Sequence, residues 1–105
     1  MNKEILVLKI NQSWRRGMTA EELYNATKKS WRLSAKRIEH VDLVLCVAEN
    51  EVREAYTVEQ WILSELEGRK EFIGHVAVQE VRQKWVGMDS THIQSPYGVT
   101  KYLKA

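Results

Sequence analysis

Residues 41–48 read VDLVLCVA, and this apolar run decides the fold that the sequence predicts. A continuous apolar run of strand length is typical of a strand at the centre of a sheet. Cys46 within it is the only cysteine of the chain, so it cannot form an internal disulfide. We interpret it as a small buried side chain, because a thiol in apolar surroundings is rarely reactive.

Other β-rich segments lie on both sides of this run. Residues 49–51, ENE, supply a polar turn, so residues 52–58 are expected to pair with the central strand as a β-hairpin. Residues 57–67 are expected to be a strand end that leads into an irregular turn. Gly74, within another β-rich segment, indicates a bulge or a close backbone approach. The remaining predicted strands are residues 4–10, 70–77 and 99–103.

A helix is predicted between the first two strands, near residues 20–31. Thr19 and Glu22 have the spacing of a capping box at its start. One face carries four residues that we expect to meet the core, namely Leu23, Ala26, Thr27 and Trp31. Another face carries a polar and basic stripe, namely Asn25, Lys28, Lys29 and Arg32. A short turn or helix is predicted at residues 34–38, and a further helix at residues 78–85.

The order of these elements indicates the fold class. A strand and a helix are followed by several strands, a short helix and a final strand, which is the pattern of an α+β protein. We predict one domain spanning residues 1–105, with a mixed, mostly antiparallel sheet curled into a small pseudobarrel. The helix in the N-terminal half is expected to pack on this sheet through Leu23 and Trp31.

The formal net charge of +2 hides two segments of opposite sign. Residues 11–40 contain seven Lys or Arg and three Glu, whereas residues 41–80 contain three Lys or Arg and nine Asp or Glu. In the first segment the cations stand beside aromatic rings. Such interleaving suits a partner with phosphates and exposed bases, because cations attract phosphates and rings stack on bases. The alternative is a solvated helix face beside tryptophans that only pack the core.

Three kinds of side chain form the candidate nucleic-acid site. Polar loop groups would hydrogen bond to a base edge, tryptophans would stack on a base, and cations would contact phosphates. Trp14 lies in a polar, basic loop and Trp31 at the predicted helix end, so each either lines a cleft or packs on the core. The candidate residues are Asn11, Gln12, Ser13, Trp14, Arg15, Arg16, Lys28, Lys29, Trp31 and Arg32.

The motifs of several catalytic and metal-binding classes are missing from the sequence. His40, His75 and His92 are scattered, without HExxH spacing or cysteine pairs, so no metal site is predicted. Walker, GxGxxG and GxSxG motifs are missing too, and we predict no cofactor and no enzymatic activity. No apolar stretch reaches the roughly 20 residues that cross a bilayer, and the N-terminus lacks a signal-peptide pattern. We therefore expect a cytoplasmic protein without a membrane partner.

Several segments occur in an order that is known from other proteins: ILVLKIN followed by SW, then ELYNATKKSWR, VDLVLCVA, VREAYTVEQW, RKEFIGH and VRQKWVGM. This order resembles bacterial small domains of the PUA-like superfamily, in the group that includes EVE and ASCH domains. The resemblance spans nearly all of residues 4–103 and rests on the order and spacing of strands and aromatics. It implies a compact pseudobarrel with helices at its ends and a basic, aromatic-lined cleft for RNA or for modified bases in DNA.

Two functions from different classes follow from these observations. The leading hypothesis is a non-enzymatic nucleic-acid-binding module that recognises RNA or a modified base in DNA. The alternative is a protein-interaction or regulatory subunit, whose acidic middle would meet a basic partner protein or the basic N-terminal region of a second copy in a homodimer. A small-molecule pocket built from the same aromatics is a third option, which leaves the basic stripe unused. Salt-dependent binding to oligonucleotides distinguishes the first hypothesis from the other two.

Overall fold

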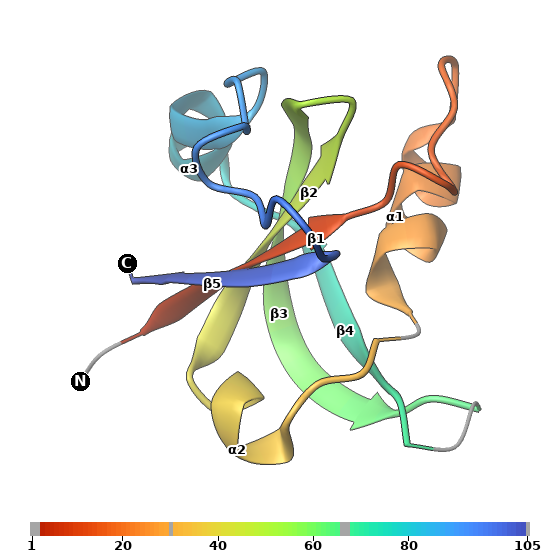
Figure 1. The fold of residues 1–105 in the computed structure, drawn as a ribbon, viewed down its shortest axis with the longest axis vertical. Helices are drawn as coiled ribbons and strands as arrows, with labels where there is room; N and C mark the ends of the chain where they lie inside the picture. The colour runs from red at the N-terminus through yellow and green to blue at the C-terminus, as the bar shows by residue number, and fades with distance from the viewer. Residues whose placement is uncertain (1–2, 30, 66–67, 105) are drawn as a thin grey trace.

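The strand predicted from VDLVLCVA lies in the middle of a five-stranded sheet. The computed structural model describes residues 3–29, 31–65 and 68–104, and within these ranges the strand order is β4-β3-β2-β1-β5 (Figure 1). The strands are β1 (Glu4–Lys9), β2 (Val41–Ala48), β3 (Glu51–Leu63), β4 (Lys70–Val76) and β5 (Thr100–Lys104). The helices are α1 (Ala20–Lys28), α2 (Ala35–Ile38) and α3 (Gln79–Trp85). No helix of the described ranges is both long enough and apolar enough to cross a membrane.

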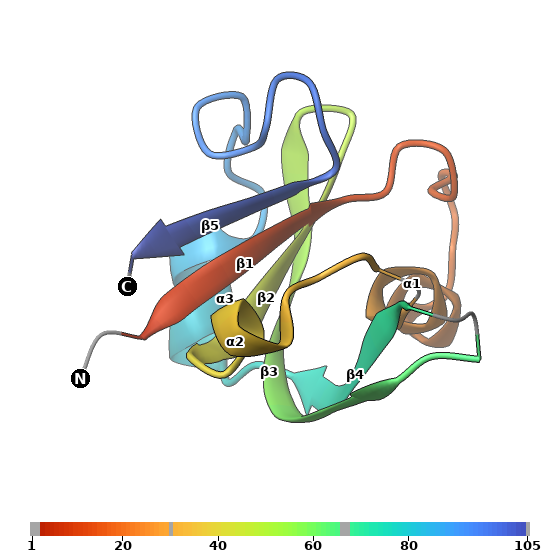
Figure 2. The same cartoon turned by 60° about the horizontal axis from the view of Figure 1, so that its bottom comes forward.

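The sheet is mixed and mostly antiparallel, as the sequence predicts. β1 pairs with β2 in parallel, and the other three pairings among the described strands are antiparallel. The parallel pairing requires a crossover, which α1 and α2 supply between β1 and β2. The sheet is not a closed barrel. Its edges are β4 and β5, which are not hydrogen-bonded to each other in the described part of the chain (Figure 2).

Each face of β2 is buried under a different helix. Alternation along the strand sends Leu45 and Val47 to one face and Val44 and Cys46 to the other, and all four are fully buried. The face with Cys46 is covered by Leu23, Tyr24 and Ala26 of α1, and the face with Leu45 by Val81 and Trp85 of α3. Burial raises the pKa of Cys46 to about 12, so its thiol stays protonated at neutral pH.

The start of α1 is built as the sequence predicts. Thr19 Oγ1 accepts a hydrogen bond from the Glu22 N–H at 3.1 Å, and Glu22 Oε1 accepts one from the Thr19 N–H at 2.9 Å. This reciprocal pair is a capping box, and it satisfies two backbone donors at the helix start. The bonds from Thr19 and from the Arg15 guanidinium lower the pKa of Glu22.

The end of α1 comes earlier than the sequence predicts. The helix ends at Lys28, and Lys29 is already extended, with φ −146° and ψ 162°. Trp31 lies beyond the helix, where its backbone forms a bridge with Lys70 at the edge of β4. The predicted helix to residue 31 is therefore wrong, and so is the helical stripe that was to include Arg32. Backbone hydrogen bonds to a distant strand have replaced those of another helical turn.

β3 is longer than the hairpin strand predicted at residues 52–58. It runs to Leu63, and its second half pairs with β4. The irregular turn that was predicted within residues 57–67 therefore begins only after Leu63. Residues 66 and 67 of that turn lie outside the described residues.

Gly74 marks a close backbone approach, as predicted. It lies opposite Val58, next to a bulge at which Glu59 of β3 has no partner in the β4 register. A Cβ at Gly74 would lie 2.0 Å from the Thr57 carbonyl oxygen, which is closer than real Cβ atoms come to backbone. The Gly74 N–H instead donates to the Tyr24 hydroxyl of α1 at 3.0 Å, which ties the helix to the sheet.

Leu45→Ala should lower the free energy of unfolding by roughly 2–5 kcal/mol, because it removes a fully buried side chain from the central strand. Denaturant unfolding followed by circular dichroism measures the change. Lys29→Ala is the control, since an exposed lysine contributes less than about 0.5 kcal/mol. A loss below about 1 kcal/mol for Leu45→Ala would contradict the central position of β2.

Gly74→Ala should lower the free energy of unfolding by about 1–3 kcal/mol, because the added methyl group forces the β3 and β4 backbones apart. The neighbouring His75→Ala is the matched control, since the His75 side chain is exposed. Thermal and denaturant unfolding of both variants provide the comparison. Equal stability of the two variants would mean that the strands do not approach so closely in solution.

Candidate nucleic-acid interface

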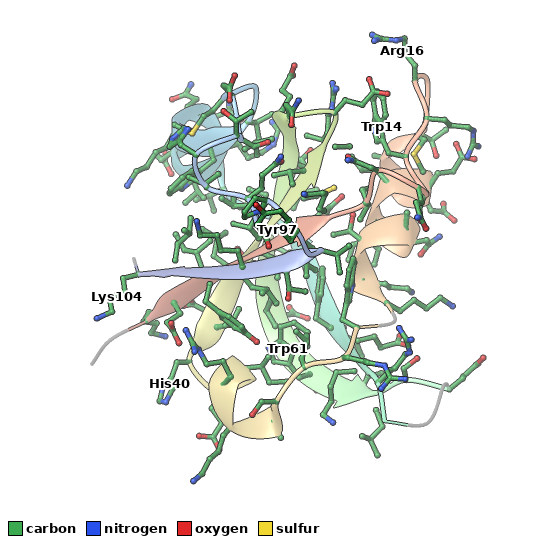
Figure 3. The ribbon with its side chains drawn as sticks, in the orientation of Figure 1. Trp14, Arg16, His40, Trp61, Tyr97 and Lys104 are labelled. Atoms are coloured by element: carbon green, nitrogen blue, oxygen red, sulfur yellow. The ribbon has the colours of Figure 1, made fainter. Side chains whose placement is uncertain are left out.

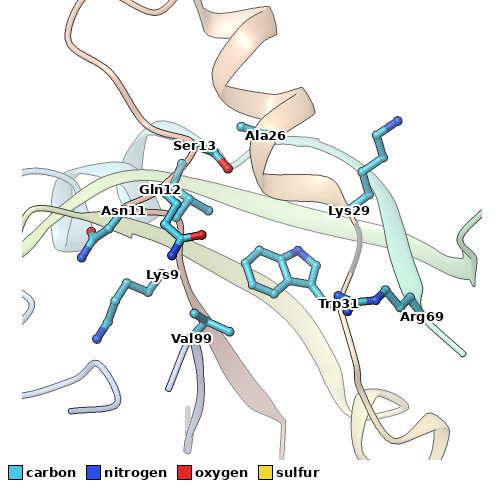
Figure 4. A pocket seen from close by; sticks show the side chains of 10 residues that line it. Lys9, Asn11, Gln12, Ser13, Ala26, Lys29, Trp31, Arg69 and Val99 are labelled. Atoms are coloured by element: carbon cyan, nitrogen blue, oxygen red, sulfur yellow. The ribbon is translucent and has the colours of Figure 1, made fainter. Parts of the chain in front are cut away.

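A pocket of about 480 Å³ opens between the C-terminal end of β1 and the C-terminal end of α1 (Figure 4). Its walls come from segments that are far apart in the sequence, including the residues just before β4 and just before β5. The lining residues are Lys9, Ile10, Asn11, Gln12, Ser13, Ala26, Lys29, Trp31, Arg69 and Val99. A cavity of this size falls within the range of small-ligand sites, which is roughly 300–1,000 Å³.

Trp31 forms one wall of the pocket and is held in place by three hydrogen bonds. Its backbone N–H donates to the Lys70 carbonyl at 2.9 Å, and its carbonyl accepts from the Lys70 N–H at 2.8 Å. The indole Nε1–H donates to the Thr27 carbonyl at 2.8 Å, in the last turn of α1. The ring therefore keeps one orientation before any ligand arrives. A wall that is already ordered loses little entropy when a planar ligand stacks on it.

Polar and charged groups surround this ring. Figure 4 shows Gln12 on one side of the indole and Arg69 on the other, with Val99 beneath it. The Lys29 side chain is exposed at the rim and extends away from the ring. The arrangement combines a flat apolar wall, an amide that both donates and accepts hydrogen bonds, and cations around the mouth.

Five of the ten predicted site residues line this pocket, namely Asn11, Gln12, Ser13, Lys29 and Trp31. Asn11 already has a structural partner, because its Oδ1 accepts from the Glu49 N–H at 2.9 Å. That bond braces the β2–β3 turn, where Glu49 and Asn50 adopt positive φ angles of 50° and 65°. Figure 4 shows the Asn11 side chain turned away from Trp31. Gln12 and Ser13 are the loop groups that remain for a ligand.

Trp14 lies outside the pocket lining. Its ring packs against the core, and the Arg53 guanidinium lies 4.1 Å from the ring centroid. The Arg16 guanidinium is also over the ring, at 5.9 Å, and Figure 3 shows the two residues near each other at the tip of the loop. The fold therefore gives Trp14 cation–π partners of its own. One of these partners, Arg53 of β3, is distant in the sequence, so the local sequence does not reveal it.

The other predicted cations are spread over the surface around α1. Arg15 forms an ion pair with Glu22 of the first helical turn. The Lys28 ammonium lies 5.3 Å from the centroid of the Tyr24 ring on the same helix. Arg32 is exposed beyond Trp31 and is not among the lining residues of the pocket. These groups do not converge on one point.

Sequence reasoning missed five lining residues, of which Lys9, Ile10 and Ala26 are near predicted ones and Arg69 and Val99 come from distant segments. Arg69 precedes β4 and reaches the pocket because Lys70, its neighbour, pairs with the Trp31 backbone. Val99 reaches it because its carbonyl accepts from the Lys9 N–H at 2.8 Å at the end of β1. No local signal could have found either residue, since both placements follow from long-range backbone pairing.

Two further observations bear on the chemistry of the site. In the ranges that the structure describes, no three His, Cys, Asp or Glu side chains are grouped so that they could hold a metal ion. The lining of the pocket supplies an aromatic face, amide and hydroxyl groups, and ammonium and guanidinium groups. Comparison of the chain with protein-family models, curated proteins and solved structures finds no match.

Proposed function

We propose that this protein is a non-enzymatic nucleic-acid-binding module of the PUA-like kind, which holds one base in the pocket beside Trp31. The observation that carries the proposal is a fixed indole wall that lines a cavity of about 480 Å³ with cations around its mouth. In this proposal the open five-stranded sheet is the incomplete barrel of such a domain. Its base would come from RNA or from DNA, including a modified base.

The pocket matches the planar part of a nucleotide. Stacking of a base on an aromatic side chain contributes about 1–3 kcal/mol. Trp31 offers this face, while Ile10 and Val99 supply apolar contacts on the other walls. Gln12 and Ser13 can each donate and accept hydrogen bonds at a base edge. These are the interactions by which proteins bind unstacked bases.

The cations match the phosphates that accompany a base. Lys29 lies at the rim on the α1 side, and Arg69 lines the pocket on the β4 side. Phosphate contacts release counterions, which makes binding depend on salt concentration. The dispersed cations Arg16 and Arg32 would add to this attraction over a longer range, whereas the charge of Arg15 is paired with Glu22.

Replacing Lys29 and Arg69 together with Gln should weaken binding to most oligonucleotides. The slope of log K against log salt should become shallower by roughly 1.4–1.8, since each lost phosphate contact removes about 0.7–0.9. Fluorescence anisotropy with labelled oligonucleotides at several salt concentrations measures both effects. Lys36→Gln is the matched control, because Lys36 is an exposed cation on α2 and does not line the pocket.

Replacing Trp31 with Ala should lower affinity while leaving the salt slope nearly unchanged, because stacking releases few counterions. Trp31 also holds the end of α1, so its variant must first be shown to be folded by circular dichroism. Gln12→Ala provides a second variant that changes only an exposed side chain of the pocket.

If the folded wild-type protein binds no oligonucleotide at low salt, the proposal fails. Light scattering across ionic strength then tests the protein-interaction alternative.

A further inference from the structure

Tyr97 presents a large aromatic ring to solvent, two residues before Val99 of the pocket lining. It is 99 % exposed, more than any other large apolar or aromatic residue in the described ranges. It belongs to the segment 95–99, SPYGV, which leads into β5, and Figure 3 shows it near the start of that strand. Val99 of the same segment is 52 % exposed and lines the pocket. An exposed ring so close in the chain to a pocket-lining residue is a candidate contact for whatever the cavity holds.

Lys9 anchors both ends of the segment 95–99 that carries Tyr97. The Lys9 backbone N–H donates to the Val99 carbonyl at 2.8 Å, and Lys9 Nζ donates to the Ser95 carbonyl at 2.6 Å. Within the turn, the Gly98 N–H donates to Ser95 Oγ at 3.0 Å. Lys9 itself lines the pocket. The turn therefore holds Tyr97 at a fixed place relative to the cavity.

The backbone of Tyr97 lies close to a residue of the pocket lining. Tyr97 is two residues from Val99, so their Cα atoms are at most roughly 7 Å apart. A tyrosine has two side-chain torsions, so it loses little conformational entropy when it contacts a partner. Segment 95–99 contains no acidic residue, so nothing in it repels a phosphate.

We propose that Tyr97 is a second stacking platform, and that the partner is a single-stranded nucleic acid with at least two consecutive unpaired bases. One base would lie against Trp31 in the pocket, and its neighbour would stack on the exposed face of Tyr97. This inference rests on the proposed function of the pocket. Single-strand binding follows because bases in a duplex are stacked on their neighbours, and exposing two of them requires several kcal/mol of unstacking and unpairing.

The test compares Tyr97→Ala with wild type on labelled single strands by fluorescence anisotropy. Loss of one stacked base should weaken binding by roughly 5- to 150-fold, and Tyr97→Phe should restore it, because the ring performs the stacking. Val78→Ala is the matched control, since Val78 is an exposed apolar residue at the start of α3. Tyr97 is exposed, so its removal leaves the core intact.

Two further probes separate this inference from the proposed function. On a strand that keeps one base and is abasic elsewhere, Tyr97→Ala should bind as well as wild type, because only the pocket is occupied. Wild type should also prefer a single strand to the duplex of the same sequence. If wild type binds single strands but Tyr97→Ala binds them equally well, or if wild type prefers duplexes, the inference fails and the proposed function stands. If wild type binds neither form, both fail.

Discussion

Burial of β2 on both faces is the constraint on which the rest of the structure depends. Leu45 and Val47 need cover on one side of the sheet, and Val44 and Cys46 need it on the other. The backbone of a strand so buried must also be hydrogen-bonded on both edges, which β1 and β3 provide. Because β1 and β2 are parallel, the chain between them has to cross one face, and α1 covers that face during the crossing. Burial thus fixes where the helix lies.

The pocket is a consequence of that crossing. The loop after β1, where the crossing begins, and the end of α1 both line the cavity. Trp31 closes the gap between them and serves two purposes at once. Its backbone extends the pairing of β4 through Lys70, and its ring forms the wall of the cavity. This wall of the pocket is therefore coupled to the stability of the helix end, whereas Gln12 is an exposed side chain that lines the pocket.

Three aromatic residues, Trp14, Trp31 and Tyr97, differ in how many contacts they make within the folded chain. Trp14 packs on the core and is covered by Arg53 and Arg16. Trp31 uses its indole N–H within the fold and also lines the pocket. Tyr97 is almost completely exposed. A ring that lacks contacts in the folded chain gains the most from an external partner, so the order Tyr97, Trp31, Trp14 ranks their availability for stacking.

The sequence by itself determined the elements that depend on burial or on near neighbours. Three features are of this kind: the apolar run of β2, the Thr19–Glu22 capping box and the close approach at Gly74. A signal within a few neighbouring residues predicts each of them. The candidate site was predicted only in part, since neighbouring loop residues turn in different directions: Gln12 lines the pocket and Trp14 packs on the core. Only the tertiary structure decided where α1 ends and which residues complete the pocket. Lys70 competes with another helical turn for the backbone of Trp31, and no local pattern encodes a partner so distant in the chain.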